Sequence, residues 1–278
     1  MAPALPGDWP VASSRFLAEG IGGRVWQVVL DDGERAVLKE PSPAAAAEIE
    51  DAIAYLGWSD GGGCVRLMER RGDLMLLEWA GSETLAGHLA GHGDDAATII
   101  AADVVRRLHA PRDHSAPPDM MRLEDHFRSL FDRATVDRRD GRRTQFVEAV
   151  EVAERLLAAQ RQVLPLHGDL HHDNVLRSSR GWIAIDPKGV VGDPVFDLAN
   201  LFYNPLGSPL RHDAARAASM AAILSGELGH PVEAILDNAF AFSALSASWH
   251  VEDGNEEEAR LSLAVGRAVL EARRQVTS

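Results

Sequence analysis

A polar stretch between two apolar runs constrains this chain more than any other part of it. The first apolar run leads into His167-Gly168-Asp169, and Asn174 follows Asp169 by five residues. The second run, residues 182–185, ends in another acid, Asp186. Phosphoryl transfer needs such a set, because one carboxylate accepts the proton of an attacking hydroxyl while an amide and a second carboxylate hold Mg²⁺ on the nucleotide phosphates. The fold must therefore bring one loop and one neighbouring strand end together.

The order His-x-Asp-x-x-x-x-Asn is similar to the catalytic loop of kinases, and the downstream acid matches their metal-binding aspartate. Asp169 or Asn174 taken singly is typical of a solvated loop in which such residues cap turns. The ordered set, with Asp186 after a strand, favours kinase chemistry. Gly168 stands where a protein kinase has the arginine that pairs with a phosphorylated activation loop, and only ten residues separate Asp186 from Asp197. These features indicate a kinase of small molecules that needs no regulatory phosphorylation.

The N-terminal region predicts a glycine loop between strands. Three short strands are expected over residues 16–18, 25–30 and 36–39. Gly20, Gly22 and Gly23 allow backbone amides to approach a phosphate, and the β-branched and aromatic residues after them exclude a dinucleotide-binding loop, which would open a helix. A plain hairpin turn also explains the glycines, and a strand-end lysine is usually an exposed edge residue. Because the catalytic loop lies downstream, we interpret Lys39 as a ligand of the α- and β-phosphates.

The segment after Lys39 predicts a helix over residues 44–56, because it is rich in alanine and follows two prolines. In kinases an acid on this helix pairs with the strand lysine. Our prediction for that acid is Glu48, with Glu50 as the alternative. Two further strands, at residues 64–69 and 73–79, complete an expected five-stranded antiparallel sheet with one helix.

The remainder of the chain reads as helical from residue 85 onward, apart from the catalytic region. Helices are expected over residues 96–109, 123–134, 146–163, 211–228, 232–250 and 256–274. The whole predicts an α+β bilobal fold, with a nucleotide-binding lobe at residues 1–79 and a larger helical lobe at residues 80–278. The hinge falls at about residues 79–82, where the carbonyl of Glu78 and the amide of Ala80 are expected to contact adenine.

Composition bounds the remaining function classes. The formal net charge is −14, with 42 acids against 28 Lys and Arg, so a nucleic-acid-binding face is disfavoured. Cys64 is the only cysteine, which excludes an intrachain disulfide. The N-terminus has neither the basic region nor the apolar core of a signal peptide, and no apolar run is long enough for a bilayer. We therefore expect a cytoplasmic protein without a membrane partner, as a monomer or weak dimer.

The full pattern resembles the aminoglycoside/hydroxyurea phosphotransferase family, and within it the streptomycin 6-phosphotransferases. The resemblance is carried by Leu-His-Gly-Asp at 166–169, Asp-Pro-Lys-Gly at 186–189, Gly-Asp-Pro at 192–194 and Phe-Asp-Leu-Ala at 196–199. It implies a protein-kinase-like fold and ATP- and Mg²⁺-dependent phosphorylation of a small-molecule hydroxyl, which would inactivate an antibiotic.

Carried over residue by residue, the resemblance makes Asp169 the catalytic base and Lys39 a phosphate ligand. Asn174 and Asp186 become the Mg²⁺ ligands. In kinases an aspartate at the position of Asp197 orients the catalytic loop by accepting hydrogen bonds from its backbone amides. We expect His167 to support the same loop.

A streptomycin-like acceptor carries guanidinium groups, so its pocket should present carboxylates and an aromatic face. Trp249 lies at the end of an apolar helix, and Glu252 and Asp253 open the acidic loop after it. Asn200, on the helix after Asp197, is a weaker candidate for the same site. The acids at 256–258 fit the first turn of the next helix, where they favour the helix dipole.

Alternatives remain open at this point. A kinase of hydroxyurea or of another small metabolite would use the same catalytic parts. A nucleotide-binding pseudokinase acting as an interaction module is disfavoured by the complete catalytic set, and so is a helical scaffold whose acids are only surface residues. The sequence defines neither the acceptor hydroxyl nor a preference for ATP over GTP.

Overall fold

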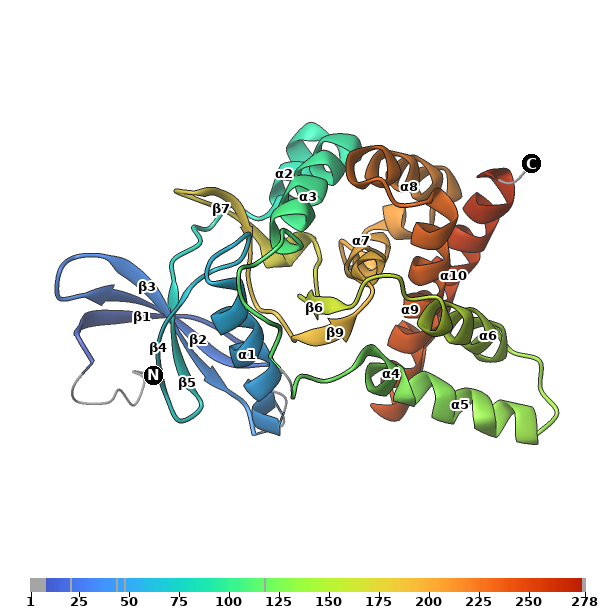
Figure 1. The fold of residues 1–278 in the computed structure, drawn as a ribbon, viewed down its shortest axis with the longest axis horizontal. Coiled ribbons are helices and arrows are strands. Elements are labelled where there is room, and N and C mark those ends of the chain that lie inside the picture. Colours follow the sequence, from blue (N-terminus) through green and yellow to red (C-terminus); the bar gives the residue numbers. More distant parts are fainter. Residues whose placement is uncertain (1–8, 21, 44, 48, 118, 277–278) are drawn as a thin grey trace.

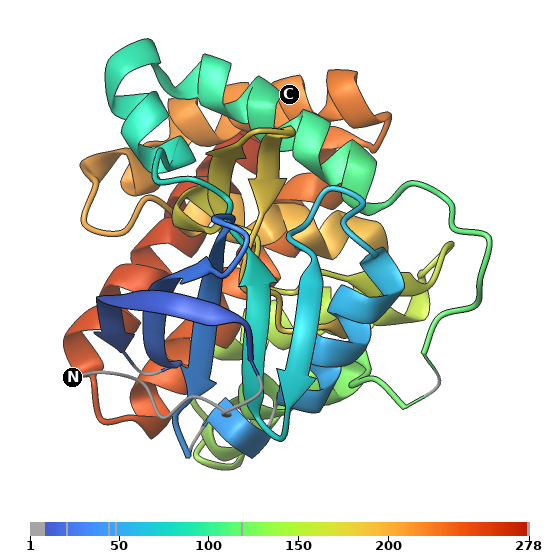
Figure 2. The ribbon, with the colours of Figure 1, turned by 90° about the vertical axis from the view of Figure 1, so that its left-hand side faces the viewer.

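The computed structural model describes residues 9–20, 22–43, 45–47, 49–117 and 119–276. A five-stranded sheet with one helix against it forms one end of the molecule, and a larger helical body forms the other (Figure 1). Viewed from the sheet end, the helices lie behind and beside the strands (Figure 2). None of the described helices is both long and apolar enough to cross a membrane.

The sheet is antiparallel throughout, with strand order β1-β2-β3-β5-β4. Its strands are β1 (Val11–Gly20), β2 (Gly23–Leu30), β3 (Arg35–Pro41), β4 (Leu67–Arg71) and β5 (Leu74–Glu78). In β2 every second side chain from Trp26 onward is buried, which is the pattern of a strand with one face on a core. Trp26 packs there with Val28, Leu38 and Leu76. The predicted five-stranded antiparallel sheet is therefore confirmed.

Two predicted boundaries in this region were wrong. A single 3₁₀ turn (Ala45–Ala47) comes first, and α1 itself runs over Ile49–Ser59. The strand predicted from residue 64 begins at Leu67, because the residues before it pair elsewhere. The Val65 amide donates to the Ala184 carbonyl at 2.9 Å, and the Ala184 amide donates to the Gly63 carbonyl at 2.8 Å. This stretch therefore ties the sheet to the catalytic region.

The helical body is arranged around α9, which is buried along most of its length. Its helices are α2 (Leu85–His92), α3 (Asp94–Leu108), α4 (Leu123–His126), α5 (Arg128–Arg139), α6 (Gln145–Ala158), α7 (Ala199–Tyr203), α8 (Ala214–Leu228), α9 (Val232–Glu252) and α10 (Glu256–Val276). The helix expected over residues 123–134 is divided at Phe127, whose ring is buried against Phe131 and Phe196. Helix α9 also extends further than predicted, so Glu252 is helical and does not lie in a loop.

Two small antiparallel strand pairs position the loop that contains Asp169. Strand β6 (Leu164–Leu166) pairs with β9 (Val190–Gly192), and β7 (Val175–Ser178) pairs with β8 (Gly181–Ala184). Both pairs lie between the large sheet and the helices (Figure 1). The loop between β6 and β7 and the segment between β8 and β9 consequently meet at one place.

Candidate active site

Asp197 fixes the start of the loop between β6 and β7. Its carboxylate accepts hydrogen bonds from the amides of His167 at 3.0 Å and Gly168 at 2.8 Å, and it lies 2.9 Å from Nε2 of His109. Burial disfavours the charged form, but the His109 contact and the charges around it hold the pKa of Asp197 below its ordinary value. The loop is thus anchored on a buried carboxylate that remains ionised.

His167 joins this loop to the end of β8. Its Nε2 lies 2.9 Å from the Ile185 carbonyl, and its Nδ1 accepts the amide of Asp169 at 3.3 Å. One nitrogen therefore donates and the other accepts, which is the arrangement of a neutral imidazole. Burial lowers the pKa of His167 in agreement with that state. His167, within the loop, and Asp197, outside it, therefore both make hydrogen bonds that support the loop.

Asp169 projects from this loop into a cleft and is held by an amide. Asn200 Nδ2 donates to Asp169 Oδ1 at 2.9 Å, and Asn204 Nδ2 donates to Asn200 Oδ1 at 2.8 Å. Burial raises the pKa of Asp169. The Asn200 side chain is buried and its amide orients Asp169, a contact that the sequence did not predict, and its place in the acceptor site stays a prediction.

Asn174 and Asp186 offer side-chain oxygen atoms near Asp169. Asn174 Nδ2 donates to the Asp169 carbonyl at 3.0 Å, which leaves its side-chain oxygen for another partner. Asp186 has φ of +58°, a conformation that is uncommon outside glycine, and its side chain is half exposed. Two hard oxygen donors suit Mg²⁺, which keeps water and phosphate oxygens as its other ligands. Among the described residues no cluster of three His, Cys, Asp or Glu side chains offers a metal site made of protein alone.

Lys39, on β3, forms an ion pair with Asp186. Glu48, the acid predicted to pair with Lys39, lies outside the described residues. The alternative, Glu50, was wrong: it pairs with Arg70 Nη1 at 2.9 Å, and this hydrogen bond lowers the pKa of Glu50. Glu50 is the second residue of α1, and this contact with Arg70 on β4 accounts for its carboxylate.

The glycine loop joins β1 to β2, with Gly20 paired with Gly23. Gly22 lines the cleft beside Lys39. Gly23 has φ of +121°, and a Cβ atom there would lie 2.1 Å from the Glu40 carbonyl oxygen. Only glycine allows β2 and β3 to approach in this way. Gly23 therefore serves the close pairing of β2 with β3 beside the cleft.

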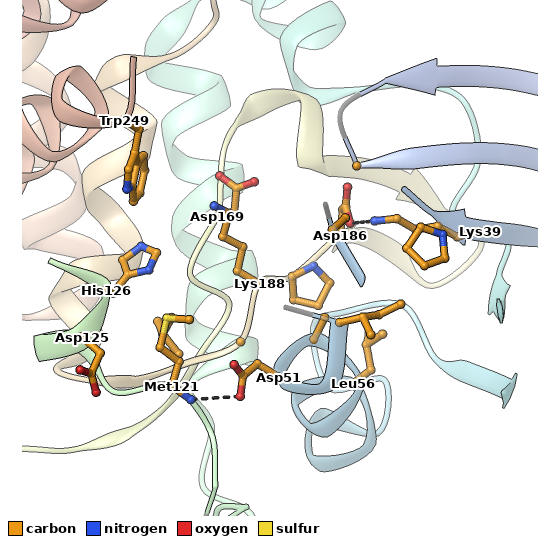
Figure 3. A pocket seen from close by; sticks show the side chains of 18 of the residues that line it. Lys39, Asp51, Leu56, Met121, Asp125, His126, Asp169, Asp186, Lys188 and Trp249 are labelled. Atoms are coloured by element: carbon orange, nitrogen blue, oxygen red, sulfur yellow. Dashed lines mark hydrogen bonds and ion pairs between the residues drawn. The ribbon is translucent and has the colours of Figure 1, made fainter. Parts of the chain in front are cut away.

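A single cleft of about 810 Å³ connects these groups. Lys39, Asp186 and Asp169 lie along it, and Trp249 and His126 lie at the opposite side (Figure 3). Leu56, Val65, Met75 and Leu77 form an apolar wall near the sheet. The cleft is thus apolar at one end and charged through the middle.

The contacts predicted at the hinge involve backbone groups, and the side chains around them do not test these contacts. Glu78 uses its carboxylate to pair with Arg180 at 2.6 Å and to accept the Arg66 amide at 3.1 Å. Burial opposes ionisation of the Glu78 carboxyl group, but the hydrogen bond from Arg180 holds its pKa below the ordinary value. The adenine contacts assigned to the Glu78 carbonyl and the Ala80 amide stay predictions.

The predicted acceptor residues Trp249, Glu252 and Asp253 all line the cleft. Ser129 Oγ donates to Glu252 Oε1 at 2.6 Å, so α5 and the end of α9 are joined at this wall. Asp132 lines the same wall and is exposed. This side of the cleft therefore carries several carboxylates. Glu252 lies at the end of α9, where Ser129 holds its carboxylate.

Two residues at this wall were not predicted. Lys188 Nζ lies 4.9 Å from the centre of the Trp249 ring, the ring that is predicted to stack on a guanidinium of the acceptor. His126 packs edge-to-face on Trp249 at 5.2 Å, and burial, with the nearby Lys188 charge, lowers its pKa to about 3. Lys188 belongs to the Asp-Pro-Lys-Gly run that served only as a family marker. Nothing in the sequence marks His126, which lies on a short helix more than a hundred residues from Trp249.

The acids at the start of α10 were assigned to the helix dipole alone, and for Glu258 this was incomplete. Its Oε1 accepts from Tyr203 Oη and from Arg211 Nη1, each at 2.8 Å. Burial opposes ionisation, yet these two donors lower the pKa of Glu258. The first turn of α10 faces the segment after α7, so Glu258 joins two parts of the helical body.

Comparison with known proteins identifies relatives across most of the chain. Residues 8–254 match the family model described as aminoglycoside/hydroxyurea antibiotic resistance kinase. A streptomycin 3''-kinase of Klebsiella pneumoniae is 39% identical over 77% of this chain and 81% of its own length. A streptomycin 6-kinase of Streptomyces glaucescens is 38% identical over 68% of this chain and 62% of its own. A hydroxyurea phosphotransferase of Kitasatospora aureofaciens is 31% identical over 94% and 76%, respectively.

Solved structures with the same fold include two kinds of small-molecule kinase. An aminoglycoside phosphotransferase from Alicyclobacillus acidocaldarius superposes with a TM-score of 0.62 at 16% identity, over 99% of this chain and 97% of that one. A choline kinase from Streptococcus pneumoniae gives 0.64 at 15% identity, over 95% and 94%. At such low identity these matches concern the fold, and they confirm that it is protein-kinase-like.

Proposed function

We propose, because the chain belongs to the aminoglycoside/hydroxyurea antibiotic resistance kinase family, that it transfers the γ-phosphoryl group of ATP to a hydroxyl of a streptomycin-type aminoglycoside. The observation that carries the proposal is the continuous cleft. It connects Lys39 and Asp186 on one side to the acidic wall at Glu252 and Asp253 on the other, with Asp169 between them.

Asp169 is the general base in this proposal. The acceptor hydroxyl gives its proton to the Asp169 carboxylate as its oxygen bonds to the γ-phosphorus. The bond from that phosphorus to the bridging oxygen breaks, and its electron pair leaves with ADP. Asn200 holds one carboxylate oxygen at 2.9 Å, so the other is the one that meets the hydroxyl. A burial-raised pKa makes this carboxylate a better proton acceptor than an exposed one.

The nucleotide side has two tasks. Lys39 would bind the phosphates from β3, sharing its charge between them and Asp186. The side-chain oxygen of Asn174 and the Asp186 carboxylate would hold Mg²⁺, which when bound neutralises part of the phosphate charge. Lys39 and Asp186 line the same cleft as Asp169, so the phosphates and the metal ion would lie beside the proposed base.

The acceptor side supports a cationic substrate. Asp132, Glu252 and Asp253 line it with exposed carboxylates, and the chain as a whole carries a formal charge of −14. Such a wall attracts guanidinium or ammonium groups and disfavours an anionic acceptor. The second candidate is hydroxyurea phosphorylation, favoured by the relative of that name, which aligns with 94% of this chain.

An acceptor panel tests this function. Purified protein with ATP and Mg²⁺ would be assayed for ADP release with streptomycin, other aminoglycosides and hydroxyurea, and the product position read by NMR. Protein with Asp169→Asn, prepared in parallel, controls for contaminating kinases. We expect the highest kcat/KM with a streptomycin-type acceptor. A higher value for hydroxyurea would transfer the proposal to the second candidate, and no acceptor-dependent ADP release from any panel member would contradict both.

A further inference from the structure

The use of lysine in this chain is confined to the cleft. Lys39 and Lys188 are the only lysines among 28 basic residues, and the other 26 are arginines. Both lysines line the same cleft. Arginine is a wide planar fork, whereas lysine is a compact charge on a flexible stem that suits a phosphate oxygen as a single point charge. A chain that uses arginine everywhere else therefore keeps the compact cation only at these two positions.

The two lysines differ in how they are held. Lys39 pairs with Asp186 on the nucleotide side. Within the part of the chain that the structure describes, no carboxylate forms an ion pair with Lys188, whose ammonium rests on the Trp249 ring at 4.9 Å. A partly exposed cation–π contact is worth only about 0.5–1 kcal/mol. The ring thus holds the Lys188 ammonium only weakly and leaves it able to take a stronger partner. Its charge also acts on the Asp169 carboxylate, where it opposes the rise in pKa that burial causes.

The surroundings of Lys188 indicate which partner that is. In Figure 3 its side chain points from the segment after Asp186 towards the region between Asp169 and Trp249. A phosphoryl group in transfer crosses the space beside Asp169 and carries negative charge towards the acceptor wall. Arg128, another cation at that wall, is already paired with Asp125. Lys188 is therefore the cation placed to offset this charge.

We propose that Lys188 is a second phosphate-directed lysine, whose ammonium leaves the Trp249 ring and donates hydrogen bonds to the non-bridging oxygens of the γ-phosphoryl group during transfer. The proposal rests on the kinase function above. Lys39 then serves the nucleotide as it binds, and Lys188 serves the group that moves. Interactions that strengthen in the transition state raise kcat more than they change substrate affinity.

Having only two lysines makes a direct chemical test possible. An ATP analogue acylated on its γ-phosphate transfers the acyl group to a nearby amine: the amide bond forms on Nζ, the acyl–oxygen bond breaks, ATP leaves and the amine proton goes to solvent. Peptide mapping by mass spectrometry then reports each lysine separately. We expect acylation of both Lys39 and Lys188, each suppressed by excess ATP. Labelling of Lys39 alone would overturn the role of Lys188 and leave the kinase function standing. Labelling of neither would count against the nucleotide site itself.

Kinetics of Lys188 variants give an independent test. Lys188→Met should lower kcat by roughly 10²–10³-fold, the range for losing one oriented charge donor, with the KM for ATP nearly unchanged. Lys188→Arg keeps the charge and should recover part of that loss. Arg260→Met, which removes an exposed cation on α10, is the matched control. If Lys188 served only to hold Trp249, Lys188→Met and Trp249→Leu would both raise the acceptor KM and leave kcat intact, and that outcome would refute the proposal.

Discussion

His172 makes a specific prediction about stability in mild acid. It lies in the catalytic loop with none of its side chain exposed, and neither ring nitrogen has a hydrogen-bond partner among the described residues. Burial, with the neighbouring Arg216 charge, lowers its pKa from 6.5 to about 3. The folded protein therefore keeps this imidazole neutral at pH values where the unfolded chain protonates it.

The magnitude follows from linkage. Because the folded pKa is the lower one, the contribution of His172 to stability is fully present above pH 6.5 and is lost as the pH falls from 6.5 towards 3. The slope in that window is about 1.4 kcal/mol per pH unit. Between pH 7.5 and 5.5 this residue alone should remove about 1.4 kcal/mol from the free energy of unfolding.

Urea unfolding of the wild type and of His172→Leu, each at pH 7.5 and 5.5, measures this contribution. Leucine does not titrate and leaves no buried nitrogen unpaired, so the variant should lose about 1.4 kcal/mol less than the wild type over that interval. All other titrating groups cancel in this difference. His92→Leu, on the exposed side of α2, is the substitution control. Equal pH dependence in wild type and His172→Leu would show that the imidazole is already protonated or solvated in the folded protein.

Three further predictions concern the proposed chemistry. Asp169→Asn should lower turnover by roughly 10²–10⁴-fold with little change in nucleotide affinity, as measured by steady-state kinetics and nucleotide titration; near-normal turnover would exclude it as the base. Asp186→Ala should weaken nucleotide binding in Mg²⁺ more than in its absence, as measured by calorimetry. An equal loss in both conditions would make Asp186 structural. Glu252→Gln with Asp253→Asn should raise the KM of a cationic acceptor and leave the KM of ATP unchanged, an effect that shrinks at high salt because screening weakens the wild-type attraction too. Unchanged acceptor kinetics would move the pocket elsewhere.

The parts of the site that the sequence predicted are local ones. Asp169 and Asn174 lie five residues apart on one loop, and Asp186 follows β8, which pairs with the preceding strand β7, so short-range order already brings them together. The antiparallel sheet was predictable for the same reason, because its hairpins join neighbouring segments. The strand predicted from residue 64 begins only at Leu67, because Val65 pairs with a residue more than a hundred positions later.

The partners of the Asn200 and Trp249 side chains could not be predicted from the sequence, because they depend on how distant segments pack. Asn200 sits on the expected helix, but whether its amide meets substrate or base is decided by Asn204, which occupies its oxygen. The Trp249 face was assigned to a ligand because no local pattern shows that Lys188 reaches it. The Asn200–Asp169 and Lys188–Trp249 contacts join segments that only the packing of α7 and α9 against the catalytic segment brings together.

Under the proposed function, the chain positions of these groups separate the catalytic residues from the acceptor wall. The proposed base, metal ligands and loop anchor all lie within residues 167–197, in the loops and short turns beside two pairs of hydrogen-bonded strands. The acceptor wall is assembled from α5 and the end of α9, where exposed side chains such as Asp132 and Glu252 contribute little to the core. Substitutions at this wall therefore alter the ligand at low cost to stability, whereas substitutions between His167 and Asp197 disturb the chemistry itself. Kinases of this fold should accordingly diverge first in the acceptor, and the identity of that acceptor is best sought by exchanging residues on α5 and α9.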